Sequence, residues 1–314
     1  MFKCVGTAGE MAVKRVAISP GVGVTSLMDC VCMAKFRGGH PFVNSAIQLS
    51  ATLDHVYIIQ DLAVSDLTKV TPTEAQMKQW LFEVICAIEW LHGRGWIHGD
   101  VKAANVLLMP SGSIRLTDFG LSLRQDWVVG RCPQLCTSTH RPLEVWLGGR
   151  VTSVVDIWAF GCFAYEMAFS RNLFGGLESI QAWSVESLPT GGVNTLIRDV
   201  MEVDAGRRWP AERVKAHPYF AGLIEPVGSL VGPESREGVP RKSLKTGLPQ
   251  SMEASIWALY GQIRDWTGMP NSEKLKTCIF MYSKLLAKDT VADHAIQGYE
   301  RDVLKFLNYN IPIL

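Results

Sequence analysis

The stretch "WIHGDVKAANVLL", residues 96–108, places His98, Asp100, Lys102 and Asn105 at fixed offsets inside an apolar frame. The flanking Trp, Ile, Val and Leu residues are of the kind found in buried segments. Charged side chains are rarely buried unless they are paired or functional. We therefore look here for catalytic residues. Gly99, between the His and the Asp, is the one residue of the stretch without a side chain.

The composition is that of a globular protein. The 314 residues are 47% hydrophobic and 19% charged, with a formal net charge of +1, which favours a sizeable core over disorder. The small net charge gives no reason to expect a nucleic-acid or a membrane partner. No segment reaches the roughly 18 uninterrupted apolar residues that a membrane span needs. The eight cysteines mostly lie in apolar runs, which indicates reduced thiols in an intracellular protein of the cytoplasm or nucleus.

Hydrophobic periodicity predicts strands and helices in a definite order. Strands are expected at 2–7, 10–18 and 55–62, helices at 25–36 and 73–95, a hairpin at 106–120, a buried helix at 154–169, and short helices up to 220. Thr73 is a candidate N-cap for the long helix, and Gly93 or Gly95 would end it. This order predicts an α+β fold in which a small β-rich part precedes a large helical part, with the chemistry in the cleft between them.

Six motifs follow one another along the chain: "AVKRV" (12–16), "HGDVKAAN" (98–105), "DFG" (118–120), "RPLE" (141–144), "DIWAFG" (156–161) and "RRWPAERVKAHPYF" (207–220). One such motif is weak, but six at workable spacings are specific. Through them the chain resembles the eukaryotic protein kinases over roughly residues 2–220. The resemblance implies a two-lobed protein kinase fold, with a truncated β-rich N-lobe and a helical C-lobe, in a domain at 1–220. Glu144 and Arg208 would form a buried ion pair that braces the C-lobe.

Catalysis by a protein kinase consists mostly of positioning and charge neutralisation. The resemblance implies that Asp100 accepts or orients the proton of the substrate hydroxyl. Lys102 would touch the γ-phosphate of ATP, as in Ser/Thr rather than Tyr kinases, and Thr137 would bond near both residues. Asn105 and Asp118 would hold Mg²⁺ through their oxygen atoms. The alternative is that these are solvated loop charges.

The same resemblance implies a nucleotide site. Lys14 would reach the ATP phosphates while paired with Asp29, which is one methylene shorter than the family's Glu and needs a closer helix. The implied adenine and ribose contacts are the sandwiching Ala12 and Leu107, backbone groups of Asp61 and Ala63, Asp66 at the ribose, and Gln60 as gatekeeper. For the apolar positions, burial in the core is the simpler explanation, and for Ala12 and Leu107 both readings can hold.

The resemblance is greatest to the cyclin-dependent kinases. Residues 21–36 align without a gap with the helix by which that family contacts its cyclin. Residues 221–250, rich in Gly, Pro and Ser, are predicted to be a linker. Residues 251–314 have a helical pattern and in part resemble a cyclin box. The implied partner of 21–36 is a cyclin or the chain's own tail; a plain amphipathic tail is the alternative.

Gly99 occupies the position of an arginine that, in this family, binds a phosphothreonine of the activation loop. Its two partner arginines are replaced by Met28 and Leu123, and the phosphothreonine position falls near Cys132. A phosphate needs several cationic donors to order a loop. We therefore hypothesise that this loop is ordered without phosphorylation; sequence drift is the alternative. Arg141 occupies a position at which an arginine favours proline after the phosphoacceptor.

The sequence also departs from the kinase pattern, because the family's first strand and glycine-rich loop would precede Met1. Three interpretations follow. The chain is a serine/threonine kinase that uses ATP and Mg²⁺ on protein substrates, with its tail as an activator in cis. Alternatively it is a pseudokinase scaffold with weak or no phosphate transfer, or a chain that lacks its natural start.

Overall fold

The computed structural model describes residues 2–6, 9–17, 24–51, 55–125, 135–184, 186 and 188–225. The predicted linker beyond 225, the predicted helical tail at 251–314 and Cys132 lie outside this part of the chain, so the predictions for them stay predictions. The chain divides into two compact units. Every residue of the predicted site belongs to the first unit, whose described residues are drawn from 2–14, 28–48 and 59–225.

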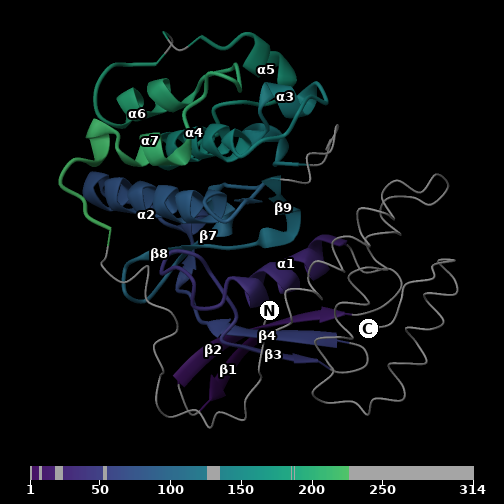
Figure 1. Cartoon of the computed structure of the whole chain (residues 1–314). Helices are drawn as coiled ribbons and strands as arrows, with labels where there is room; N and C mark the ends of the chain where they lie inside the picture. The colour runs from purple at the N-terminus through teal and green to yellow at the C-terminus, as the bar shows by residue number, and fades with distance from the viewer. Residues whose placement is uncertain are drawn as a thin grey trace, which may run out of the picture. The chain divides into compact units, whose positions relative to one another are not determined.

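Four strands near the N-terminus form one sheet in the order β1-β2-β4-β3 (Figure 1). Their bounds are Phe2–Gly6 for β1, Gly9–Ala17 for β2, Gln48–Ala51 for β3 and His55–Asp61 for β4. Strands β1 and β2 are antiparallel, with Phe2 opposite Val13. Every second residue of β4, from Val56 to Gln60, is buried, as expected for a strand with one covered face. The sequence predicted β1, β2 and β4 but not the short β3.

Helix α1 (Val24–Lys35) follows β2 in the chain and includes the buried Asp29. Directly after it, Phe36 makes edge-to-face contacts with three aromatic rings. Its centroid lies 5.7 Å from that of Trp90, 5.5 Å from that of Trp96 and 5.0 Å from that of Phe119. Such pairs are favourable beyond the area they bury. These ring contacts fix the end of α1 against Phe119, the residue directly after the predicted metal ligand Asp118.

Helix α2 (Glu74–His92) begins with a capping box. The Thr73 hydroxyl accepts a hydrogen bond from the Gln76 N–H at 3.3 Å, and the Gln76 side chain accepts one from the Thr73 N–H at 2.9 Å. This pairing satisfies two N–H groups that a helix start leaves without partners. The helix ends at Gly93. The predicted start and end of this helix are confirmed.

Helix α4 (Val154–Phe169) is apolar nearly all round and almost wholly buried, as expected for a helix at the centre of a helical layer. Helices α2 and α6 (Val193–Val200) pack against it, and α7 (Ala211–Lys215) packs on α2 (Figure 1). The shorter helices are α3 (Leu143–Trp146) and α5 (Leu177–Gln181). In the described part of the chain, no helix combines the length and the apolar character needed to cross a membrane.

Two small sheets carry the loops of the predicted site. Strands β5 (Ser65–Asp66), β7 (Val106–Leu108) and β8 (Ile114–Leu116) form one, in the order β5-β7-β8. Strands β6 (Trp96–Ile97) and β9 (Leu123–Arg124) form the other. The predicted hairpin is therefore present as β7 and β8. The 3₁₀ turns are η1 (Leu67–Lys69), η2 (Ala103–Asn105), η3 (Phe119–Leu121), η5 (Ser138–His140) and η7 (Pro218–Phe220).

Candidate active site

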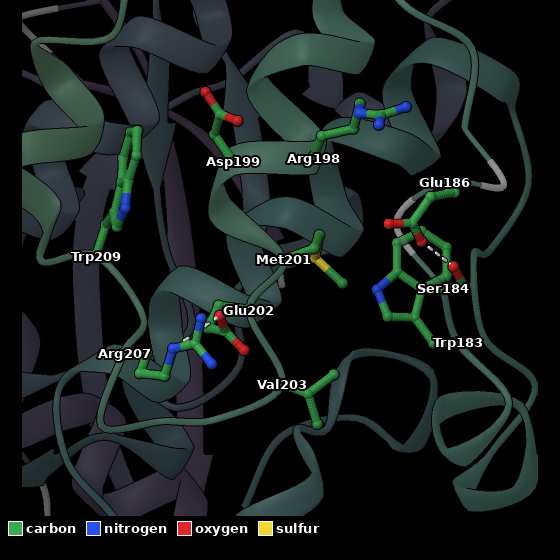
Figure 2. A pocket seen from close by; sticks show the side chains of 10 residues that line it. All are labelled: Trp183, Ser184, Glu186, Arg198, Asp199, Met201, Glu202, Val203, Arg207 and Trp209. Carbon is green, nitrogen blue, oxygen red and sulfur yellow. Dashed lines mark hydrogen bonds and ion pairs between the residues drawn. The ribbon is translucent and has the colours of Figure 1, made fainter.

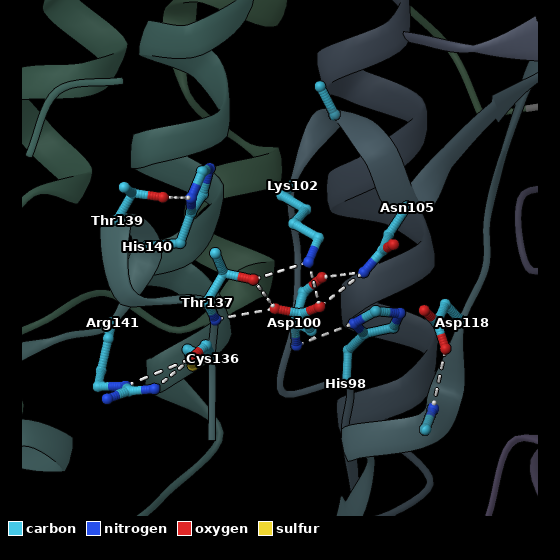
Figure 3. Close-up of polar contacts among 12 residues, drawn as sticks. His98, Asp100, Lys102, Asn105, Asp118, Cys136, Thr137, Thr139, His140 and Arg141 are labelled. Carbon is cyan, nitrogen blue, oxygen red and sulfur yellow. Dashed lines mark hydrogen bonds and ion pairs between the residues drawn. The ribbon is translucent and has the colours of Figure 1, made fainter. Parts of the chain in front are cut away.

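Asp100 lies at the centre of a network of hydrogen-bond donors (Figure 3). Its Oδ1 accepts hydrogen bonds from the Thr137 backbone N–H at 2.9 Å and the Thr137 hydroxyl at 2.7 Å. Its Oδ2 lies 2.7 Å from Lys102 Nζ and 2.9 Å from Asn105 Nδ2. Lys102 Nζ also donates to the Thr137 hydroxyl at 2.7 Å, which closes the network. The structure thus brings together Asp100, Lys102, Asn105 and Thr137.

The surroundings of Asp100, which is 6% exposed, decide its charge. Burial alone would raise the pKa of its carboxyl group. The hydrogen bonds from Lys102 and Thr137, together with the charge of Lys102, outweigh burial and lower this pKa. Asp100 is therefore ionised at neutral pH and acts as an acceptor. An acceptor of this kind is suited to orient a hydroxyl group that gives up its proton.

A second buried carboxylate, Asp156 in α4, supports the loop that carries Asp100. Its Oδ2 accepts a hydrogen bond from the His98 N–H and its Oδ1 one from the Gly99 N–H, both at 2.8 Å. His92, at the end of α2, lies 2.8 Å from the same Oδ2. Sequence reasoning assigned Asp156 no role. An acidic residue inside an apolar helix was the available indication, because a buried carboxylate requires donors.

Asp118 has an unusual backbone conformation, with φ at 63° and ψ at 76°. Few residues other than glycine adopt this left-handed region, and such conformations are concentrated at functional sites. The residue is exposed, and its Oδ1 accepts a hydrogen bond from the Gly120 N–H at 3.4 Å. The carboxylate is therefore presented on a fixed turn and open to a ligand.

Asn105 and Asp118 fit the Mg²⁺ that the sequence predicts. Asn105 Nδ2 donates to the Asp100 carboxylate at 2.9 Å and to the Asp100 carbonyl at 2.8 Å. Its amide oxygen therefore remains as the ligand atom. Within the described residues, no group of three or more His, Cys, Asp or Glu side chains forms a metal cage. Mg²⁺ needs none, because one or two protein oxygens and substrate phosphates usually bind it.

Lys14 in β2 and Asp29 in α1 form an ion pair, with Nζ 2.6 Å from Oδ2. The short Asp side chain thus reaches the strand. Burial would lower the pKa of Lys14, but the charge of Asp29 and its hydrogen bond outweigh burial and raise it, with a smaller contribution from Asp118. Lys14 is therefore a cation throughout the physiological pH range, a charge that suits a phosphate-binding group.

The apolar residues predicted to contact adenine differ in burial. Ala12 in β2 is 2% exposed, whereas Leu107 in β7 and Ala63, after β4, are half-buried. Leu107 lies opposite Asp66 in the pairing of β5 with β7. Two of the predicted contacts, Leu107 at the adenine ring and Asp66 at the ribose, therefore occupy neighbouring positions on β7 and β5.

The two carboxylates predicted at the nucleotide site are engaged within the chain. Asp61 Oδ2 lies 2.5 Å from Arg115 Nη1. Asp66 Oδ1 accepts a hydrogen bond from the Thr68 N–H at 3.0 Å, and its Oδ2 lies 2.9 Å from Lys69 Nζ. Asp66 therefore caps the turn η1. The role predicted for Asp61 uses only its backbone and is unaffected by the ion pair.

Arg141 holds Leu135 and Cys136 near the C-terminal end of the activation loop, the segment between the DFG and RPLE motifs. Its Nε donates to the Leu135 carbonyl at 2.9 Å and its Nη2 to the Cys136 carbonyl at 2.9 Å, as Figure 3 shows in part. Its guanidinium carbon lies 4.5 Å from the centroid of the Trp146 ring. Cys136 has φ at 61°, and its N–H donates to the Gly99 carbonyl at 2.9 Å. Arg141 therefore fixes the direction of two backbone carbonyls.

Met28 and Leu123, which replace the family's phosphate-binding arginines, are packed against other residues. Met28 is buried. Leu123 pairs with Ile97 and packs on a hydrophobic cluster. The buried members of this cluster are Ile97, Leu135, Cys136, Val145, Val151 and Val155. Apolar packing therefore holds both described ends of the activation loop.

A hollow of about 490 Å³ lies away from Asp100, around α6 and the segments that flank it (Figure 2). Several of its charged side chains are paired within the chain. Arg207 Nε lies 3.6 Å from Glu202 Oε2, and His217 Nε2 lies 3.1 Å from Asp199 Oδ2. No predicted site residue lines this hollow, so it has no part in the assignment of the active site.

The order of these elements and the geometry around Asp100 agree with a family comparison. A sequence model of the protein kinase domain matches residues 1–220. The chain belongs to the protein kinase domain family. Membership of this family implies the two-lobed kinase fold of mixed helix and sheet, which the sequence predicted. The subdivision of the chain at 220 and 250 stays a prediction.

Three curated relatives are similar to this protein kinase domain. The stress-activated protein kinase JNK of Suberites domuncula is 33% identical over 132 residues, 41% of this chain and 37% of the relative. That of Drosophila melanogaster is 32% identical over 140 residues, 43% of this chain and 38% of the relative. Mitogen-activated protein kinase kinase kinase 1a of Physcomitrium patens is 28% identical over 222 residues, 64% of this chain and 28% of the relative.

Each match spans well under half of the relative's own length. None of the three is a cyclin-dependent kinase by name. The predicted closeness to that group, and the cyclin-like character of the tail, therefore stay predictions.

Proposed function

We propose that this chain is a serine/threonine protein kinase, which transfers the γ-phosphate of ATP to Ser or Thr hydroxyls of protein substrates. The observation that carries the proposal is the network in which the ionised Asp100 contacts Lys102, Asn105 and Thr137. Membership of the protein kinase domain family, and similarity to two stress-activated kinases and a mitogen-activated kinase kinase kinase, support it.

In the proposed reaction, the substrate hydroxyl oxygen forms a bond to the γ-phosphorus. The bond from that phosphorus to the β–γ bridging oxygen breaks, and ADP leaves. Asp100 orients the hydroxyl group and takes up its proton. Lys102, which Asp100 and Thr137 hold in place, donates hydrogen bonds to the transferred phosphoryl group. Lys14, held by Asp29, binds the ATP phosphates.

The proposed nucleotide site surrounds this network. Mg²⁺, when bound at Asn105 and Asp118, supplies charge neutralisation at the phosphates. The proposed nucleotide contacts are Ala12 and Leu107 at the adenine ring, the backbone of Asp61 and Ala63 at its edge, and Asp66 at the ribose.

The Cys136 carbonyl is the basis of a proposed preference for proline directly after the phosphoacceptor. Arg141 Nη2 donates a 2.9 Å hydrogen bond to this carbonyl, and Cys136 has φ at 61°, outside the extended-strand region. A carbonyl that a guanidinium already engages is a poor acceptor for the N–H of the incoming residue. An N–H left without an acceptor is unfavourable. Proline has no N–H and avoids this loss.

The proposed partner of residues 21–36 is either a cyclin or the chain's own residues 251–314. The proposed location of the protein is intracellular. Helix α1 occupies most of this stretch, and its Asp29 holds Lys14. A protein that contacts α1 would therefore act on the Lys14 ion pair. Deletion of residues 250–314 is expected to reduce phosphate transfer by the kinase. Unchanged transfer would refute activation by the tail.

The proposed function is tested with the full chain and labelled Mg-ATP, offered with Ser-Pro, Ser-Ala and Tyr peptides, and Asp118→Asn as the inactive control. We expect label on the Ser-Pro peptide above the Ser-Ala peptide, none on the Tyr peptide, and loss of all transfer in the control. Transfer equal to that of the control would refute the kinase and favour the scaffold. Equal labelling of the Ser-Pro and Ser-Ala peptides would refute only the proline preference, which Arg141→Ala is expected to abolish.

A further inference from the structure

Thr117, the residue directly before Asp118, is held on three sides. Its N–H donates to the Asn105 carbonyl at 2.9 Å, and its carbonyl lies 3.0 Å from His98 Nε2. Its hydroxyl accepts a hydrogen bond from Asn44 Nδ2 at 3.0 Å. The first two contacts come from the loop of the active site. The third comes from the segment between α1 and β3.

The backbone of Asn44 is fixed against β8. Val43 and Leu116 form a parallel bridge, and the Asn44 N–H donates to the Leu116 carbonyl at 2.8 Å. The Leu116 N–H in turn donates to the Phe42 carbonyl at 2.9 Å. Asn44 is 1% exposed. A buried side chain on a backbone fixed in this way is a rigid support for Thr117.

The same amide group reaches the strand that leads to the proposed adenine contacts. Asn44 Nδ2 lies 3.4 Å from Gln60 Oε1, and Gln60, which is 3% exposed, directly precedes Asp61. Asn44 Oδ1 is buried and has no hydrogen-bond partner among the described residues. A buried acceptor without a donor is unfavourable. This acceptor reduces the net stabilisation that the two hydrogen bonds donated by the Asn44 amide can give.

We propose that Asn44 is a positioning residue for phosphoryl transfer. Through Thr117 and Gln60 it fixes Asp118 relative to β4, the strand that leads to the proposed adenine contacts. The inference rests on the proposed function, because it treats Asp118 as a ligand of Mg²⁺. The left-handed conformation of Asp118 persists only while its neighbours restrain it, and Thr117 is the neighbour that Asn44 restrains. Outer contacts that orient a metal ligand typically change metal affinity by about 10- to 100-fold.

The test uses the full chain and a fluorescent ATP analogue, whose binding is measured while Mg²⁺ is titrated. Asn44→Leu removes both donated hydrogen bonds, Thr117→Val removes the hydroxyl, and Thr117→Ser keeps it. We expect Asn44→Leu and Thr117→Val each to raise the Mg²⁺ concentration for half-maximal binding by about tenfold. Thr117→Ser is expected to stay near the wild-type value. The double variant is expected to be no worse than Asn44→Leu, because both changes remove the same bond.

Asn194→Leu is the matched control. Asn194, at the start of α6 and outside the site, also has a buried Oδ1 without a partner among the described residues. Its replacement is expected to change thermal stability without changing the Mg²⁺ dependence. A folded Thr117→Val variant with wild-type Mg²⁺ dependence would overturn the inference, even if Asn44→Leu failed to fold.

The two proposals are separable because the readout is nucleotide binding. A wild-type chain that binds the analogue without any dependence on Mg²⁺ would also overturn the inference. A wild-type chain that transfers no phosphate, but whose Mg²⁺-dependent binding is weakened by Thr117→Val, would refute the proposed function alone.

Discussion

Asp29 and Phe119, which are 90 residues apart in the chain, are joined by a hydrogen bond in which Asp29 Oδ1 accepts from the Phe119 N–H at 2.8 Å. The other oxygen of the same carboxylate, Oδ2, lies 2.6 Å from Lys14 Nζ. Asp29 is 3% exposed. One buried carboxylate therefore joins α1 both to β2 and to the loop of Asp118, so a shift of α1 would move Lys14 and Phe119 together.

Asp29→Asn keeps the shape of this side chain and removes its charge. We expect kcat/KM for peptide phosphorylation to fall by about 100-fold, the loss typical of reacting groups misplaced by about 1 Å. The KM for ATP should rise because Lys14 loses its partner. Asp29→Glu, which restores the family's residue, is expected to be impaired as well. Its side chain is one methylene longer, which would displace the carboxylate from its contacts with Lys14 Nζ at 2.6 Å and the Phe119 N–H at 2.8 Å. Wild-type kinetics in Asp29→Asn would contradict this role.

Gly99 has a conformation and surroundings that disfavour a side chain. Its φ is +80°, and an added Cβ would lie 2.7 Å both from the Leu121 carbonyl oxygen and from Leu135 Cδ1. These two residues lie at the described ends of the activation loop. Leu121 and Leu135 therefore pack directly on the glycine, at the position where the family resemblance places a phosphate-binding arginine. Residues 126–134 lie outside the described part of the chain, so the hypothesis that the loop is ordered without a phosphate stays a prediction.

Gly99→Ala is expected to lower the free energy of unfolding through two effects. The left-handed conformation costs about 1–2 kcal/mol, and the steric overlap adds about 1–3 kcal/mol. Gly112→Ala is the matched control, since Gly112 has φ +85° with nothing within 4 Å of an added Cβ. It should show only the first effect. Chemical denaturation compares the two variants, and equal destabilisation would refute tight packing at Gly99. Gly99→Arg should be at least as destabilising as Gly99→Ala.

Elements whose determinants are close in sequence were predictable. The start of α2 depends on Thr73 and Gln76, three residues apart, and its end on Gly93. Contacts between distant segments were not predictable. Asp156 accepts a hydrogen bond from the N–H of His98, which is 58 residues away in the chain. Asn44 donates one to the hydroxyl of Thr117, which is 73 residues away. A polar residue in an apolar run indicates a buried contact, but tertiary packing decides which distant group becomes its partner.

The ion pairs at Lys14 and at Arg208 show how the resemblance supplemented the local patterns. No periodicity connects Lys14 with Asp29 or Glu144 with Arg208. They were expected only because a related fold supplies the tertiary arrangement, and both pairs are present in the structure. The chemical roles of these residues depend on bound substrate and stay proposals.

His40, in the segment after α1, has both ring nitrogens engaged. The Phe42 N–H donates to Nδ1 at 3.3 Å, so Nδ1 carries no proton, and Nε2 carries it 3.2 Å from Glu225 Oε1. Burial lowers the pKa of His40 below its usual 6.5. Glu225 opposes this shift, while the charges of Arg94 and Lys215 add to it. The folded chain therefore favours the neutral ring.

At His40, the unfolded chain binds a proton more readily than the folded chain, so stability is lost as the pH falls through 6.5. Burial would raise the pKa of Glu225, but hydrogen bonds from His40 and Lys215 lower it below 4.5, which adds a further loss in stronger acid. We expect Tm to fall by a few degrees between about pH 7.5 and pH 5.5. His40→Gln keeps a neutral N–H donor and should flatten this fall in thermal unfolding. An equal fall in both proteins would assign the effect to other groups.

Arg208 and Arg207 are neighbours in sequence with opposite surroundings. The side chain of Arg208 is 0% exposed and that of Arg207 is 75% exposed. Arg208 donates two hydrogen bonds to the Glu144 carboxylate, at 2.7 and 3.2 Å, and one to the Val154 carbonyl at 3.0 Å. Arg207 Nε lies 3.6 Å from Glu202 Oε2. The two residues therefore form a matched pair for a test of the buried ion pair.

Arg208→Ala is expected to lower the free energy of unfolding by about 3–5 kcal/mol, because it leaves the Glu144 carboxylate, with its side chain only 13% exposed, without its cation. Arg207→Ala should change it by less than about 0.5 kcal/mol, as surface substitutions usually do. Urea denaturation measures both. The double change Arg208→Met with Glu144→Leu should recover part of the loss, since an apolar pair of similar volume needs no compensating charge. Equal effects of the two alanine variants would show that the buried pair does not stabilise the helical part of the kinase.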